Sequence, residues 1–146
     1  MSQLEDFLTA SEEQEVISAI QKAEKMTSGE IRVHIESNID KPPYERVLEV
    51  FHALKLDETQ AHNGVLFYVA INSKTFAIYG DRGINKIVSN DFWKSTKDIV
   101  IANFKEQKFK KGLVAGILET GKQLQKFFPV QPHDQNELPD HISKGS

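Results

Sequence analysis

The side chains of this sequence that could do chemistry are acids and amides placed next to turns. In the segment AIYGDRGINK, Asp81 and Arg82 stand between Gly80 and Gly83. Glycines around two opposite charges are compatible with a phosphate cradle, a metal-binding loop or a plain turn. The segment is shorter than the GxxxxGK loop and does not match GxGxxG, so nucleotide binding has little support. The role of Asp81 therefore depends on which residues the fold brings beside it.

Three apolar segments are predicted to form β-strands. Residues 30–36 alternate between apolar and polar side chains, which is typical of a strand with one buried face. On this pattern His34 is predicted to be solvated. Residues 65–71 (VLFYVAI) are apolar throughout, which favours a central strand. Residues 72–74 (NSK) then reverse the chain into a third strand, TFAIY, to form a hairpin.

Four helices are predicted around these strands. The first begins with a capping box and carries an apolar stripe, and the second begins at a pair of prolines. The fourth contains glycines whose spacing favours close helix packing. The predicted boundaries are Thr9 to Gly29, a start at Pro42-Pro43, a cap at Ser89, Asn90 or Asp91, and about Lys110 to Phe127.

This order of elements predicts an α/β fold, namely a three-layer α/β/α sandwich with a small mixed sheet and Rossmann-like topology. The strand–helix–strand crossover makes the first two strands parallel, and the hairpin makes the third antiparallel. The starts of the first two strands and the end of the third then share one edge of the sheet. Candidate residues at or near this edge are Glu30, His62, Asn63, Asp81 and Asp91, with Asp98 two turns further along the helix face of Asp91.

Carboxylates, amide carbonyls and backbone carbonyls at one edge are the ligands that hard cations prefer. The sequence therefore predicts a divalent-metal site, for which the proposed ligands are Glu30, Asn63, Asp81, Asp91 and Asp98. The alternative is that these acids are ordinary helix caps and surface charges, with Arg82 as an ion-pair partner.

The opposite edge of the sheet is ranked second as a binding site. Ligands of open α/β sheets usually bind at the carboxyl ends of the parallel strands. Here, however, one of the two loops is a tight hairpin, and a glycine-rich strand-to-helix turn is missing. The polar residues of this edge are Ser37, Asn38, Asp40, Asn72 and Ser73.

The composition limits the function classes further. The chain has 146 residues, a formal net charge of −3 and no cysteine, which excludes thiolate chemistry and argues against nucleic acid as a partner. Neither a signal peptide nor a membrane span is recognisable, so we expect a cytoplasmic monomer. We expect residues 1–128 to form the domain and residues 129–146 to form an extended polar tail.

The order of the motifs resembles the TPM domain family. The resemblance runs from about residue 9 to 127 and rests on SGEIRVHIES, HNGVLFYVAINSKTFAIYGDRGI and FKKGLVAGILETGKQL. It implies an α/β/α sandwich, an acidic cleft for a divalent metal that is often calcium, and a phosphatase label in part of the family. His62 replaces the usual acid before Asn-Gly, and the end of the chain looks like that of small bacterial members. Residues that match the family pattern are Glu30, Asn63, Gly64, Gly80, Gly83 and Asp98.

Three functional hypotheses follow. The first is an interaction module that binds a divalent cation, Ca²⁺ by the resemblance, in the acidic cleft, with a possible protein partner. The second is a metal-assisted phosphatase acting on phosphomonoesters, with Asp81 or Asp98 as base and Arg82 steadying the charge. The third is an adaptor that uses a lysine-rich surface made by Lys105, Lys108, Lys110 and Lys111.

Overall fold

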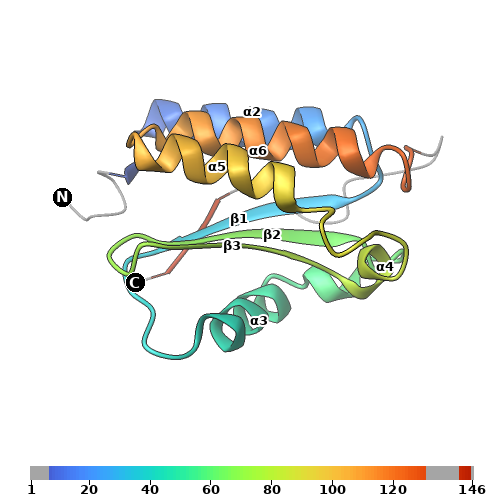
Figure 1. Cartoon of the computed structure of the whole chain (residues 1–146), viewed down its shortest axis with the longest axis horizontal. Coiled ribbons are helices and arrows are strands. Elements are labelled where there is room, and N and C mark those ends of the chain that lie inside the picture. The colour runs from blue at the N-terminus through green and yellow to red at the C-terminus, as the bar shows by residue number, and fades with distance from the viewer. Residues whose placement is uncertain (1–6, 131–141, 146) are drawn as a thin grey trace.

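A computed structural model describes residues 7–130 and 142–145 of the chain. A central four-stranded sheet lies between two layers of helices (Figure 1). The elements are α2 (Ala10–Glu24), β1 (Glu30–Glu36), α3 (Pro43–Ala53), the 3-10 turn η1 (Leu56–Glu58), β2 (Gly64–Ala70), β3 (Thr75–Gly80), α4 (Arg82–Asn85), α5 (Lys94–Lys105), α6 (Phe109–Leu124) and β4 (Ile142–Lys144).

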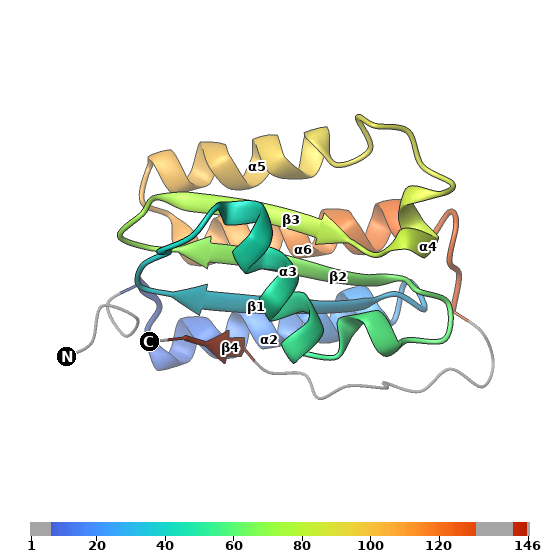
Figure 2. The ribbon, with the colours of Figure 1, turned by 90° about the horizontal axis from the view of Figure 1, so that it is seen from below.

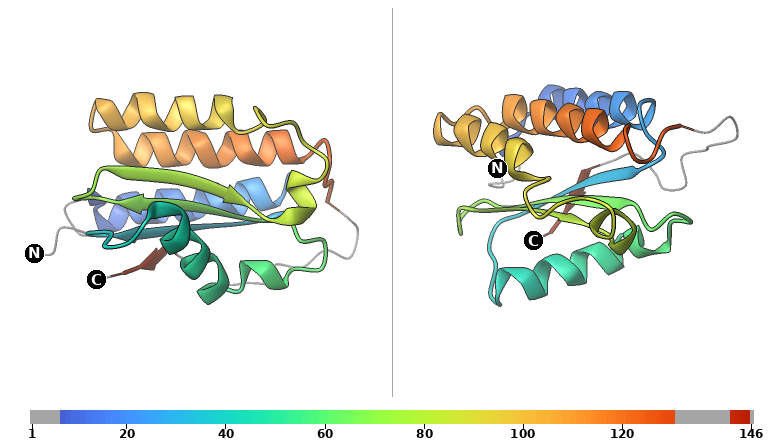
Figure 3. Two further views of the ribbon diagram at one scale, coloured as in Figure 1. Left: turned by 60° about the horizontal axis from the view of Figure 1, so that its bottom comes forward. Right: turned by 45° about the vertical axis from the view of Figure 1, so that its right-hand side comes forward.

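The layers confirm the predicted sandwich. Helices α2, α5 and α6 cover one face of the sheet, and α3 with the turn η1 lies on the other (Figure 3). The strand order is β3-β2-β1-β4. As predicted, β1 and β2 are parallel, and β2 and β3 form an antiparallel hairpin.

The C-terminal segment adds a strand that the sequence pattern did not predict. Ile142–Lys144 pairs in parallel with β1, opposite residues 33–35. The remainder of the predicted tail is described only at residues 129, 130 and 145. Residues 131–141 and 146 lie outside the described part of the chain.

Both faces of β1 are buried, which makes the prediction of a solvated His34 wrong. Arg32, His34 and Glu36 are only 3%, 5% and 2% exposed, because α3 covers their face of the sheet and β4 lies along the strand's edge. The apolar side chains of β1 pack on the opposite face, against the layer of α2, α5 and α6. Alternation in this strand therefore separates two buried environments, one apolar and one polar.

Two helix boundaries differ from the prediction. A short helix, α4, directly follows β3 and begins after Asp81. The next helix begins at Lys94, without a side-chain cap, because the segment before it forms turns in which Phe92 N donates to Ser89 O and Lys94 N donates to Asp91 O. The capping box of the first helix is confirmed, with Thr9 and Glu12 hydrogen-bonded to each other's backbone.

Candidate functional site

The amino-terminal edge of the parallel strands brings together three of the five predicted ligands. Glu30 pairs with Gly64 across β1 and β2, and its N–H lies 3.4 Å from Asn63 O. Asp81 follows β3 and donates its N–H to Gly64 O at 2.9 Å. Glu30, Asn63 and Asp81 therefore flank one backbone position, Gly64, as the predicted topology requires.

Glu30 belongs to an ion-pair network at the start of β1. Its carboxylate lies 3.3 Å from the Arg32 guanidinium, which also donates to Glu24 Oε2 at 2.8 Å. The side chains of Glu30 and Arg32 are 4% and 3% exposed. Buried charges are tolerated when they are paired in this way. The carboxylate of Glu30 thus stabilises Arg32 within the fold.

Asn63 holds the loop that precedes β2. Its amide nitrogen donates to Ser28 Oγ at 3.2 Å, and its Oδ1 accepts from the Thr59 hydroxyl at 3.4 Å. Its backbone N–H donates to Thr59 Oγ1 at 3.2 Å. The side chain is 1% exposed. These contacts explain an asparagine here by loop geometry alone.

Asp81 has a carboxylate oxygen to spare, as does Asp57 of η1 among the described residues. Its Oδ1 accepts from Arg82 N at 2.7 Å and caps α4. Its Oδ2 is buried and has no hydrogen-bond partner within residues 7–130 and 142–145. A buried polar atom without a partner costs free energy, and a water molecule or a cation would satisfy it.

A histidine and an arginine extend from Asp81 toward solvent. His62 Nδ1 lies 3.6 Å from Asp81 Oδ2, and His62 Nε2 lies 2.9 Å from the Arg82 guanidinium. Because arginine only donates, Nε2 must accept, which places the proton of a neutral imidazole on Nδ1, facing Asp81. The three side chains form a line that runs from a buried carboxylate to an exposed cation.

The other two predicted ligands lie elsewhere. Asp91 accepts a 2.5 Å hydrogen bond from the Ser89 hydroxyl, which lowers the pKa of its carboxyl group. Asp98 pairs with Lys94 at 3.1 Å, and its side chain is 64% exposed. Both residues line a shallow groove between α5 and β3.

The described residues contain no group of three or more histidine and acidic side chains placed to hold a metal ion. What they offer a hard cation is the spare oxygen of Asp81 and the carbonyls of the neighbouring loop. The carbonyl oxygens of Ala61 and His62 lie so close to Gly83 that a β-carbon there would collide with both. Oxygens of this kind suit Ca²⁺ when water completes the shell. Of these oxygens, His62 O already accepts from Gly83 N at 2.8 Å, so the described residues supply one spare carboxylate oxygen beside a loop of backbone carbonyls.

The lysine-rich surface is partly neutralised. Lys110 pairs with Glu15 of α2 at 3.2 Å, and Lys108 lies 3.8 Å from Glu106. Pairs of this kind on an exposed surface contribute little to stability. They also reduce the positive potential available to an anionic partner.

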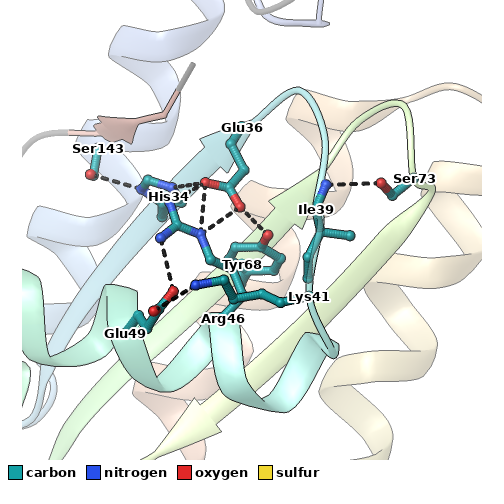
Figure 4. Close-up of polar contacts among 9 residues, drawn as sticks. All are labelled: His34, Glu36, Ile39, Lys41, Arg46, Glu49, Tyr68, Ser73 and Ser143. Atoms are coloured by element: carbon teal, nitrogen blue, oxygen red, sulfur yellow. Dashed lines mark hydrogen bonds and ion pairs between the residues drawn. The ribbon is translucent and has the colours of Figure 1, made fainter.

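A second polar cluster, which the sequence reasoning missed, lies beneath α3 near the opposite edge (Figure 4). Glu36 accepts a fork of hydrogen bonds from Arg46, including Nη2 to Oε1 at 2.7 Å and Nε to Oε2 at 3.0 Å. The Tyr68 hydroxyl donates to Glu36 Oε2, and His34 Nε2 lies 2.9 Å from Glu36 Oε1. The other ring nitrogen of His34 lies 2.9 Å from Ser143 Oγ of β4. We call these five residues the Glu36 cluster.

The environment of the Glu36 cluster shifts several pKa values. Burial alone would raise the pKa of Glu36, but hydrogen bonds from Arg46, Tyr68 and His34 outweigh it and lower that pKa to about 2. Burial lowers the pKa of His34 despite the neighbouring carboxylate. Burial and Glu36 together raise the pKa of the Tyr68 hydroxyl. The signal in the sequence was Tyr68, the one polar group in an otherwise apolar central strand.

With the fold and both clusters defined, comparison with known proteins identifies the family. The model of the TPM domain matches residues 1–123. The chain belongs to the TPM domain family. It is also 52% identical to BA42, a protein from the psychrophilic bacterium Bizionia argentinensis whose NMR structure has a TM-score of 0.92. That match covers 99% of this chain and 100% of BA42.

Two more distant solved structures share the fold alone. The N-terminal domain of a protein from P. gingivalis is 16% identical with a TM-score of 0.70, covering 87% of this chain and 83% of that one. The N-terminal domain of cg2496 from Corynebacterium glutamicum is 11% identical with a TM-score of 0.62, covering 95% and 80%. A search of curated proteins gives no match. No helix of the described residues is long and apolar enough to cross a membrane.

Proposed function

We propose that this TPM domain is a binding module that takes up a divalent cation, Ca²⁺, at Asp81. The observation that carries the proposal is the buried Oδ2 of Asp81, which lacks a hydrogen-bond partner among the described residues. The loop carbonyls beside Gly83 and water supply the remaining oxygens. Glu30 is not a ligand in this proposal, since its carboxylate is paired with Arg32 at 3.3 Å.

One carboxylate implies weak binding. Calcium sites gain affinity with the number of charged ligands, and the weakest protein sites have dissociation constants of about 10⁻⁴ to 10⁻³ M. We expect this site to fall in that range.

The test is a Ca²⁺ titration followed by amide NMR. In the unmodified chain we expect shifts centred on residues 80–84 and on the loop at residues 61–64. Asp81→Asn keeps the shape and the cap of α4 while it removes the charge, so these shifts should weaken at least tenfold. Asp98→Asn is the matched control, because Asp98 is exposed and paired with Lys94, and it should change nothing. Flat spectra up to about 5 mM Ca²⁺, at the weak end of known protein sites, overturn the proposal.

A phosphatase remains the second candidate, and one observation favours it. Arg82, His62 and Asp81 form a line in which an arginine could hold a phosphoryl group beside an imidazole that a carboxylate orients. Asp98, the alternative base, lies on α5 and is paired with Lys94. Hydrolysis of p-nitrophenyl phosphate that needs Ca²⁺ or Mg²⁺ and disappears in both Asp81→Asn and Arg82→Ala would favour the enzyme. Cation binding without turnover favours the binding module.

A further inference from the structure

The outer side of β3 is an open edge of the sheet. It is the first strand in the order β3-β2-β1-β4, and the described residues supply no strand beyond it. Its sequence, TFAIYG, contains neither a charged residue nor a proline. Natural proteins usually protect sheet edges with such residues, with bulges or with a cover, because open edges pair with other chains. The sequence of β3 therefore contains none of the charged or proline residues that usually prevent pairing with another chain.

The register identifies the backbone groups that the edge presents. In an antiparallel pair, successive residues turn their N–H and C=O groups alternately toward and away from the neighbouring strand. Asp81 N donates to Gly64 O, so Tyr79, Ala77 and Thr75 face β2. Phe76 and Ile78 therefore point their backbone groups outward. The outward carbonyl of Gly80 already accepts a hydrogen bond from the side-chain amide of Asn85 at 2.9 Å.

A groove runs beside this edge. It has a volume of about 580 Å³ and lies between Ile78 and helix α5, which runs alongside β3 at the margin of the sheet (Figure 2). The spacing of its α5 residues corresponds to one helix face. Ile101, at its far end, is 37% exposed. The groove is lined by Ile78, Asn90, Asp91, Trp93, Lys94, Lys97, Asp98 and Ile101.

The charges of this groove leave one cation without a counter-ion. Lys94 is paired with Asp98, and Asp91 accepts a hydrogen bond from Ser89. Lys97 forms no ion pair with any described residue. The groove thus combines an apolar floor with one lysine, Lys97, and one carboxylate, Asp91, that form no ion pair among the described residues.

The other edge of the same sheet shows how such a surface is filled. There a three-residue strand, β4, pairs with β1, and its Ile142 is buried to 8% exposure in the core that includes α2. Two residues later, Lys144 reaches Glu13 of α2 at 2.7 Å. The segment that fills this edge is therefore an extended strand. Its apolar residue, Ile142, enters the core, and two residues later a charged residue, Lys144, pairs with an acid of the helix that covers it.

We propose that the β3 edge binds an extended peptide from another protein as a fifth strand of the sheet. The backbone of the peptide hydrogen-bonds to the outward groups of Phe76 and Ile78. An apolar side chain enters the groove beside Ile78 and Ile101, and an acidic side chain two residues away pairs with Lys97. In this mode main-chain bonds give affinity and alternate side chains give specificity.

The probe for this proposal is a phage-displayed library of random nonapeptides, selected on the intact protein. We expect enriched peptides to contain a β-branched or aromatic residue and, two residues away from it, an aspartate or glutamate. Synthetic copies of them should shift the amides of residues 75–80 and of α5 in NMR spectra. Lys97→Glu should weaken these peptides at least about fivefold, because it replaces an exposed attraction by a repulsion. Lys122→Glu is the matched control, an exposed lysine on α6, and should leave binding unchanged.

Three outcomes overturn the proposal. The first is a selection without enrichment, and the second is enriched peptides whose shifts map to another surface. The third is shifts at residues 75–80 that arise on raising the concentration of the protein alone, which would assign the edge to a second copy of the chain. Enriched acidic peptides that lose affinity in Lys97→Glu, in a variant whose spectrum shows an intact fold, support it.

Discussion

At the scale of single residues, the Glu36 cluster is where burial and charge are most tightly balanced. Glu36 is 2% exposed, yet it is ionised because Arg46, Tyr68 and His34 all donate to it. A buried pair of this kind adds little over an apolar replacement, but removal of one partner leaves the others unpaired. The cluster therefore ties β1, β2, β4 and α3 into one arrangement.

Glu36→Gln should lower the free energy of unfolding by about 3 kcal/mol at pH 7, the low end for breaking a buried ion pair. It should also change the response to acid. The folded-state pKa of Glu36 is lowered from 4.5 to about 2, so its stabilisation is present above about pH 4.5 and is lost as the pH falls toward 2. The lowered pKa of His34 has the same sign and acts below its ordinary value of 6.5. Urea unfolding between pH 2 and 8 measures both effects.

The matched control is Glu49→Gln, since Glu49 also contacts Arg46 but is 42% exposed. Hydrogen bonds from Lys41 and Arg46 also lower the pKa of Glu49, but these pairs are exposed, so the stability and acid profile of Glu49→Gln should change much less than those of Glu36→Gln. An equal loss in both variants would show that the charge of Arg46, and not the burial of Glu36, sets the effect. Asp91, whose pKa is also lowered, keeps some acid dependence in both chains, so an acid profile of Glu36→Gln as steep between pH 4.5 and 2 as that of the unmodified chain would contradict the assignment to Glu36.

At the scale of elements, the helix layer depends on small residues at the contact of α2 with α6. As the glycine spacing of α6 predicts, Gly121 lies directly against Ala23, and a β-carbon there would come within 2.8 Å of Ala23 Cβ and 2.9 Å of Ala23 Cα. Contacts under 3 Å to backbone atoms force the two helices apart. Glycine in the helix is tolerated because it permits this approach, although it weakens the isolated helix.

Gly121→Ala should destabilise the fold by about 2 kcal/mol, the typical cost of overpacking a core, even though alanine favours helix formation. Thermal unfolding measures the change. Lys122→Ala is the control, because this next residue on α6 is exposed and gains helix propensity without a clash. A stabilised Gly121→Ala variant would mean that the helices can separate at little cost.

At the scale of the whole molecule, the two edges of the sheet differ in whether the described residues cover their backbone groups. The β1 edge is closed in two ways: Glu24 Oε2 accepts from Ile31 N at 3.2 Å, and β4 covers residues 33–35. Ile142–Lys144 thus completes the sheet on this side, whereas none of the described residues forms a strand beyond β3.

Removal of the chain from Ile142 onward should expose the β1 edge without unfolding the domain. The amides of Val33 and Ile35 lie on the same side of β1 as that of Ile31, so they face β4 and should exchange with solvent faster. The Ile31 amide, held by Glu24, is an internal control and should keep its protection. The pKa of His34 should rise toward 6.5, because the loss of β4 hydrates the ring. Hydrogen exchange and a histidine NMR titration measure these changes, and unchanged exchange at Val33 and Ile35 would contradict them.

Local patterns were sufficient to predict most of the elements and their order. The capping box of Thr9, the unbroken apolar run of β2 and the turn at residues 72–74 each act over a few residues. Parallel β1 and β2 followed from the crossover between them, which placed Glu30, Asn63 and Asp81 at one edge. These features could be predicted because helix and strand propensity, helix capping and the period of apolar residues depend only on residues close together in the chain.

Only the tertiary structure decided what those residues do. It paired Glu30 with Arg32, left one oxygen of Asp81 without a partner among the described residues, and placed Asp91 and Asp98 in a different groove. It also buried His34 and Glu36 together with Tyr68 and Arg46, residues up to 34 positions apart along the chain. The reason is physical: the sequence determines which face of an element is polar, whereas burial, pairing and the pKa of each group depend on what packs against that face.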